Sequence, residues 1–179
     1  VGNELNCNNC HFGCGNTFGG KNGSISLVGS PKWYPAYNAR FQKEITLKDR
    51  IDNCFRRSMN GKPLPHDSKE MEALVAYLTW ISSNVEHLKE FPWRGLPRFN
   101  LDHTPDPIKG KEIYMKTCAT CHMPNGEGMS KKEGTLEIPP IFGPQSYNDG
   151  AGMNRLEILS SFVYYNMPFD QPSLTKEEA

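Results

Sequence analysis

The chain has 179 residues, and its 20 basic and 20 acidic side chains cancel. A neutral chain without a run of like charge gives no reason to expect nucleic-acid binding or a charged tail. No stretch approaches the roughly 20 apolar residues that span a bilayer, and the N-terminus lacks the basic and apolar profile of a signal peptide, so we expect a soluble chain that has already been trimmed.

A Cys-x-x-Cys-His pattern occurs twice, in Cys7, Cys10 and His11 and again in Cys118, Cys121 and His122. In this pattern two thiols form thioether bonds with a haem, and the histidine is a ligand of its iron. A single Cys-x-x-Cys would also suit a redox dithiol or half of a zinc site, but two copies ending in histidine favour haem. We predict two covalently bound haem c groups and, because they are attached outside the cytoplasm, a periplasmic location.

Residues 12–45 are rich in glycine and serine without periodicity, so we expect an irregular segment. Thr46 is the expected cap of a helix that ends at Asn60 and Gly61. A second helix is expected to begin at Asp67 or Ser68. Its apolar face consists of Met71, Leu74, Val75, Leu78 and Ile81.

Cys54, in the first of these helices, is the expected second ligand of the first haem. Arg50, Cys54 and Ser58 follow at intervals of four residues, which places all three on one side of a helix. Arg57 lies near the same stripe, and guanidinium groups beside a thiol lower its pKa and favour the thiolate.

Other interpretations of Cys54 remain open at this point. It could be a small buried residue, or it could form a disulfide with Cys14, the other cysteine outside the two motifs. Met59 and His66 are weaker candidates for the ligand of the first haem.

Residues 90–107 are rich in proline and lack periodicity, which predicts a linker between domains of residues 1–94 and 95–179. Pro107 is expected in the first turn of a helix that runs into Cys118, with Ile108, Ile113 and Tyr114 buried. Another helix is expected over residues 153–165. The predicted fold class is therefore mainly α, with two consecutive class I cytochrome c-like domains and long loops; the first carries a catalytic haem and the second an electron-transfer haem.

Met167 is the expected second ligand of the second haem, because it follows the 153–165 helix and precedes a proline. A thioether ligand raises the potential of haem iron and suits electron transfer. The backbone carbonyl of Pro139 or Pro140 is expected to orient His122. Met167 could instead be a core residue, and the other candidate ligands are Met123, Met129 and Met153.

The arginines of the first half indicate what its haem would bind. Arg40, Arg50 and Arg57 are more cationic groups than an electron carrier needs near its iron. Guanidinium groups pair with oxyanions in bidentate fashion, and an iron–thiolate centre suits a sulfur-containing anion. The sequence therefore predicts a small anionic substrate.

Four segments, Val1–His11, Tyr34–Arg40, Asp49–Leu64 and Gly143–Met153, resemble the dihaem thiosulfate dehydrogenases, which form tetrathionate, and the related tetrathionate reductases. The resemblance extends over nearly the whole chain. Its most specific part is the helix with Cys54, which in that family carries the cysteine ligand of the catalytic haem.

The resemblance implies that the chain couples two thiosulfate ions to tetrathionate or reduces tetrathionate, exchanging electrons with a soluble or membrane-linked partner. It implies a substrate pocket lined by Arg40, Arg50 and Ser58. It also implies His11 and Cys54 as ligands of the first iron, His122 and Met167 as ligands of the second, and Cys54 as the site of a covalent sulfur intermediate.

Two positions depart from the family. Asn166 lies where the family has a lysine in some members, which implies no ligand switching through lysine, and Cys14 is outside the family pattern. Two other functions remain as alternatives. One is a dihaem electron-transfer module without its own substrate. The other is an enzyme that attaches thiosulfate to the cysteine of a carrier protein.

Overall fold

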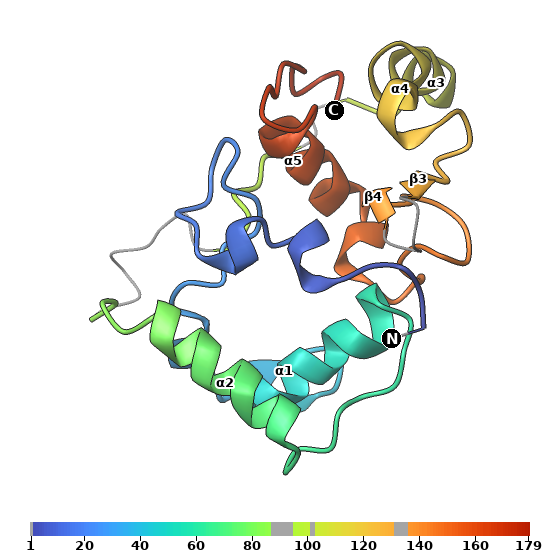
Figure 1. Ribbon diagram of the computed structural model, residues 1–179. Helices are drawn as coiled ribbons and strands as arrows, with labels where there is room; N and C mark the ends of the chain where they lie inside the picture. The colour runs from blue at the N-terminus through green and yellow to red at the C-terminus, as the bar shows by residue number, and fades with distance from the viewer. Residues whose placement is uncertain (1, 87–94, 101–102, 131–135) are drawn as a thin grey trace.

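The computed structural model describes residues 2–86, 95–100, 103–130 and 136–179. Within these ranges the fold is mainly helical. Its α-helices are α1 (Leu47–Asn53), α2 (Lys69–Ile81), α3 (Pro107–Ile113), α4 (Ala119–His122) and α5 (Leu156–Asn166). Figure 1 shows α1 and α2 in one lobe and α3, α4 and α5 in another, with the N-terminal segment passing between them. None of the helices in the described ranges is long and apolar enough to cross a membrane.

The two predicted helices of the first half are confirmed. Thr46 accepts a hydrogen bond from the Asp49 amide at 3.2 Å, and the Asp49 carboxylate accepts one from the Thr46 amide at 2.8 Å, which fixes the start of α1. Ser68 accepts from the Met71 amide and caps α2. Met71 and Leu78, on its predicted apolar face, are buried.

The helix that begins with α1 does not stay α-helical to its end. Residues Cys54–Ser58 form a π-helical turn directly after α1. Helical periodicity does not reveal such a widened turn, and turns of this kind are frequent at functional sites.

Two short antiparallel hairpins complete the secondary structure. β1 (Ala36–Asn38) pairs with β2 (Lys43–Ile45), with Ala36 opposite Ile45. β3 (Met129–Ser130) pairs irregularly with β4 (Leu136–Ile138). The prediction of an irregular segment was wrong for β1 and β2, because strands of three residues are too short to show an alternating pattern.

The second half begins as predicted. Asp106 accepts hydrogen bonds from the amides of Ile108 at 2.9 Å and Lys109 at 3.3 Å, and Pro107 occupies the first turn of α3. The helix continues through a π-helical turn, Tyr114–Cys118, into α4. The predicted burial of Ile108 was wrong, since its side chain is 73% exposed. Ile113 is half-buried on the other side of the helix, because five residues rotate a helix by about 140°.

A small apolar core joins the two lobes. It consists of Met153, Ile158 and Phe162, all buried, and Cys10 and Phe12 of the first lobe pack against it. α5 begins three residues later than predicted, after a 3₁₀ turn at Gly152–Asn154. The predicted linker falls partly in residues 87–94 and 101–102, outside the described residues, and the domain boundary after residue 94 stays a prediction.

Candidate functional site

A cavity of about 740 Å³ lies between the first motif and the α1 region. Its lining includes Cys7, Cys10, His11, Arg50, Cys54 and Ser58. The volume is within the roughly 300–1,000 Å³ that is usual for cofactor and ligand pockets. The structure therefore brings the predicted stripe of the α1 region to the same cavity as the first haem motif.

His11 is held in the orientation that an iron ligand needs. Its Nδ1 lies 2.7 Å from the Ile25 carbonyl oxygen and donates to it, which leaves Nε2 as the second ring nitrogen available to a partner. The His11 ring and the Cys54 thiol both line the cavity and lie close enough for His11 to help lower the pKa of that thiol. A ligand histidine that donates its other nitrogen to a backbone carbonyl is the usual arrangement at metal centres. These residues fit a haem attached at Cys7 and Cys10.

Cys54 has the electrostatic surroundings of a thiolate. Arg50 Nη1 donates to the Cys54 Sγ at 3.0 Å. Burial by itself raises the pKa of the Cys54 thiol, but the Arg50 charge and the hydrogen bonds with His11 and Arg50 outweigh it and bring that pKa down to about 7. The charge of Cys54 in turn raises the pKa of Arg50. At neutral pH a large fraction of Cys54 is therefore a thiolate, the form that binds metals and acts as a nucleophile.

Cys14 does not pair with Cys54. Both are free thiols, so the disulfide alternative is not supported. Cys14 is exposed, its amide donates to Asn8 Oδ1 at 2.9 Å, and its carbonyl accepts from the Tyr77 hydroxyl at 3.0 Å. The backbone of Cys14 is thus fixed while its thiol stays accessible.

Tyr34 is a site residue that sequence reasoning missed. It lines the same cavity, and its hydroxyl hydrogen bonds with Arg50. Burial raises the pKa of Tyr34, and the neighbouring Arg50 charge partly offsets this effect. The residue follows a 3₁₀ turn, Ser30–Trp33, in the segment without periodicity, and its place at the start of the Tyr34–Arg40 segment is the only signal for it in the sequence.

The other predicted arginines lie beside the cavity. Arg40 is absent from the described residues that line it, and its Nη1 donates to the Gly150 carbonyl at 3.0 Å. The Arg57 guanidinium stacks on the Phe41 ring at 5.1 Å. Burial and then the charges of Arg40 and Arg50 lower the pKa of Arg57. The three guanidinium groups therefore lie near one another, and Arg50 is the one that reaches into the cavity.

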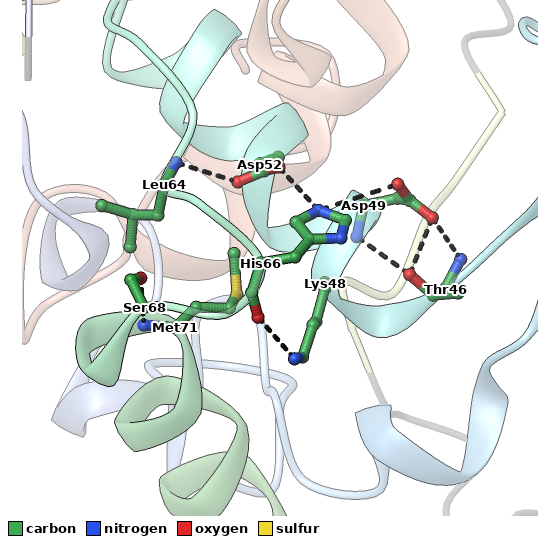
Figure 2. Close-up of polar contacts among 8 residues, drawn as sticks. All are labelled: Thr46, Lys48, Asp49, Asp52, Leu64, His66, Ser68 and Met71. Carbon is green, nitrogen blue, oxygen red and sulfur yellow. Dashed lines mark hydrogen bonds and ion pairs between the residues drawn. The ribbon is translucent and has the colours of Figure 1, made fainter.

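Polar contacts join α1 to the segment from Leu64 to His66 that follows it, as Figure 2 shows. Asp52 is buried, and its carboxylate accepts from the Leu64 amide at 3.2 Å and lies 2.9 Å from His66 Nε2. Lys48 donates to the His66 carbonyl at 2.6 Å. His66 is therefore a partner of Asp52 and is outside the described lining of the cavity, which contradicts its role as a haem ligand. Met59 is buried and does line the cavity.

The second motif has the same histidine arrangement as the first. His122 Nδ1 lies 3.0 Å from the Pro139 carbonyl oxygen, as predicted. Burial lowers the pKa of His122, and the bond to Pro139 only partly offsets this effect, so the ring is held neutral, the form that binds iron. Met167 directly follows α5 and packs, half-buried, against the core that joins the lobes. Its role as an iron ligand stays a prediction.

The other methionine candidates for the second haem have other surroundings. Met153 is buried in the core, and Met129 is exposed.

A further cavity, of about 750 Å³, is lined by no residue of either motif. It is lined by His103, Tyr164, Leu174, Thr175, Lys176 and Glu177.

Two family profiles match the chain. The profile described as SoxA/TsdA, cytochrome c domain matches residues 2–86, and the cytochrome c profile matches residues 108–175. These matches confirm the predicted fold class of two cytochrome c domains, each with one haem-attachment motif.

Characterised relatives match the chain over its full length. It is 37% identical to thiosulfate dehydrogenase from Allochromatium vinosum, over all of this chain and 67% of the relative. It is also 37% identical to thiosulfate dehydrogenase from Psychrobacter arcticus, over all of this chain and 54% of the relative. The solved structure of the thiosulfate dehydrogenase TsdBA from Marichromatium purpuratum superposes with a TM-score of 0.90 at 33% identity, covering 99% of this chain and 39% of that one. The chain thus spans between about half and two thirds of the length of these curated relatives.

Proposed function

Because the chain belongs to the thiosulfate dehydrogenase family of c-type cytochromes, we propose that it joins two thiosulfate ions into tetrathionate, or reduces tetrathionate, at the cavity of the first motif. The observation that carries this proposal is the contact between Arg50 Nη1 and Cys54 Sγ at 3.0 Å, opposite His11. A plain electron carrier needs neither a thiolate nor a guanidinium at this position.

The arginines address the main obstacle to the reaction. Two thiosulfate dianions repel each other, and positive charge placed at their meeting point lowers that repulsion. Arg50 is at the cavity, and Arg40 lies close enough to Arg57 for its charge to lower the pKa of Arg57. Thiosulfate docks its oxyanion group against Arg50, and Ser58, which also lines the cavity, donates its hydroxyl to it, while Arg40 adds positive charge beside the cavity.

Cys54 is the residue at which the new sulfur–sulfur bond forms first. Cys7, Cys10 and His11 would hold haem c in the cavity that Cys54 also lines, and the haem would supply a centre that takes up electrons one at a time. The Cys54 thiolate and the outer sulfur of one thiosulfate form a bond, and two electrons leave to the redox centres. The outer sulfur of a second thiosulfate then attacks the outer sulfur of the first, and the bond between that sulfur and Cys54 breaks. Tetrathionate leaves, and Cys54 returns as a thiolate without any proton being consumed.

The second motif serves electron exchange in this proposal. Cys118 and Cys121 would hold the second haem, His122 and Met167 would bind its iron, and a thioether ligand would give it a raised potential suited to receiving electrons. From there electrons pass to a soluble or membrane-linked partner. Periplasmic placement follows from the attachment chemistry, which occurs outside the cytoplasm.

The test mixes the haem-loaded protein with thiosulfate and ferricyanide, and measures tetrathionate together with the electrons that ferricyanide takes up. We expect two electrons for each tetrathionate, loss of turnover in Cys54→Ala, and retention in Cys14→Ala, because Cys54 is the thiol that contacts both His11 and Arg50. Reduced viologen with tetrathionate measures the reverse direction.

Two outcomes would overturn the proposal. Absence of turnover in both directions, with both haems in place, would leave an electron carrier. Turnover that appears only when a carrier protein with a free cysteine is added, and that attaches thiosulfate to it, would identify the carrier-modifying enzyme instead.

A further inference from the structure

A buried side chain connects the two lobes between the haem-binding segments. Asn166, the last residue of α5, has no exposed surface. Its Oδ1 accepts a hydrogen bond from the Ser24 amide of the first lobe at 2.7 Å, and its Nδ2 donates to the Phe162 carbonyl one turn earlier at 2.9 Å. Asn166 therefore anchors the end of α5 to the first lobe, and Met167 is the next residue along the chain.

Ser24 continues this connection into the first haem motif. It also has no exposed surface. Its hydroxyl accepts from the Phe12 amide at 2.7 Å and donates to the Cys10 carbonyl at 3.0 Å. Cys10 and Phe12 flank His11 on both sides. One chain of hydrogen bonds thus runs from the backbone around His11 through Ser24 to Asn166.

Further contacts hold the same two segments together. The Phe12 ring packs edge to face against Phe162 at 5.7 Å and against Phe169 at 5.2 Å, so it contacts the chain before and after Met167. Met167 itself packs against the core that Cys10 and Phe12 also contact. The segment that carries Met167 thus packs against residues 10–24 of the first lobe, which we call the attachment loop of the first haem.

We propose that Asn166 is a positioning residue that holds Met167 in place for the iron of the second haem by binding the attachment loop of the first. The proposal rests on the assignment of Met167 as that ligand in the proposed function. Asn166 would thus make the binding of the second haem depend on a contact with the first lobe. The attachment loop of the first haem would set how strongly Met167 is held at the second.

The expected effect follows from the buried amide of Ser24. In Asn166→Ala that N–H loses its acceptor in a place that water does not reach, and an unpaired buried donor is costly. The structure relieves this cost by moving the end of α5 away from the loop, and this movement shifts Met167 from its position. We therefore expect the methionine to be displaced more easily from the ferric second haem.

The measurement uses the haem-loaded protein without thiosulfate. The near-infrared absorption band of methionine-ligated ferric haem reports the second haem alone, and imidazole is titrated until this band is lost. In Asn166→Ala we expect the apparent dissociation constant for imidazole to fall about tenfold, together with a lower potential of the second haem.

Ser161→Ala is the matched control. Ser161 is as buried as Asn166 and lies in the same helix, but its hydroxyl donates to the Glu157 carbonyl within α5. This variant should keep the imidazole affinity of the unchanged protein. If Asn166→Ala does not load haem, Ser24→Ala breaks the same connection at its other end and should raise the imidazole affinity at least threefold.

A change below twofold in haem-loaded Asn166→Ala would overturn the proposal, as would an equal change in Ser161→Ala or the absence of the methionine band from the unchanged protein. Failure of the proposed function is a separate result, because it appears in the tetrathionate assay. A protein that makes no tetrathionate but loosens its methionine in Asn166→Ala would retain the positioning role.

Discussion

Replacing Arg50 with glutamine removes the cation that the structure places on the Cys54 sulfur. The Arg50 Nη1 to Cys54 Sγ hydrogen bond of 3.0 Å is charge-assisted, and such bonds contribute about 1.5–3 kcal/mol. Solvent in the cavity screens the pair, so we take the lower end of this range. Loss of the contact to a docked oxyanion adds a similar amount, for a total of about 3 kcal/mol. This corresponds to a decrease in kcat/KM for thiosulfate of roughly 100-fold.

The assay is the initial rate of ferricyanide reduction over a range of thiosulfate concentrations, with haem content checked for each variant. Both a higher KM and a lower kcat are expected, because Arg50 contacts the nucleophile and faces the substrate. Arg50→Lys keeps the charge but not the planar fork, so its activity should fall between those of Arg50→Gln and the unchanged protein.

Arg56→Gln is the matched control for this experiment. Arg56 lies in the π-helical turn Cys54–Ser58, and its side chain is exposed. Its hydrogen bond with Asn148, at 2.9 Å, uses the backbone carbonyl of Arg56, which the substitution keeps. Its kcat/KM should stay within twofold of the unchanged protein. If Arg50→Gln, with both haems in place, stays within threefold as well, the reasoning about this arginine is refuted.

Tyr34→Phe, which removes the hydroxyl that bonds to the cavity arginine, should raise KM for thiosulfate about threefold to tenfold, whereas Tyr37→Phe on an exposed ring should not; equal KM values would contradict the role of Tyr34. Asp52→Ala removes the buried carboxylate that binds the Leu64 amide and His66, and it should lower the free energy of unfolding in urea by about 1–3 kcal/mol. An unchanged urea midpoint would contradict this role of Asp52. Thr46→Ala should cost about 1 kcal/mol through loss of the cap. Hydrogen bonds from Thr46 hold the pKa of Asp49 below its usual value of 3.8, so they stabilise the fold above about pH 4, and this contribution is lost as the pH falls through the depressed pKa. The difference in unfolding free energy between Thr46→Ala and the unchanged protein should therefore shrink in acid, and a constant difference from pH 6 to pH 3 would contradict this cause.

The parts of the fold that the sequence predicts are those with strong local signals. Thr46 and Ser68 are side-chain caps, and the apolar face from Met71 to Leu78 repeats at helical spacing, so α1 and α2 were predicted with their starts. The Cys-x-x-Cys-His motifs define their own chemistry. The stripe of Arg50, Cys54 and Ser58 was predicted from helical geometry alone. All three residues line the cavity of the first motif although a π-helical turn follows α1.

The features that were not predicted depend on contacts between distant residues. Tyr34 lies beside Arg50 because the 3₁₀ turn before it directs the chain to the cavity, and its place in the Tyr34–Arg40 segment is the only indication of this in the sequence. Asn166 and Ser24 are 142 residues apart. The exposure of Ile108 depends on which side of α3 faces the rest of the molecule, which seven residues of helix do not show.

The central claim is that the sulfur of Cys54, set between His11 and Arg50, forms the bond with thiosulfate. The most direct test quenches the haem-loaded protein in acid within the first turnover and measures the mass of the peptide that contains Cys54. We expect that peptide to carry the added mass of one thiosulfate group, and a further addition of thiosulfate before quenching to remove it with release of tetrathionate. Rapid turnover with Cys54 unmodified at every time point, and retained in Cys54→Ala, would contradict the claim.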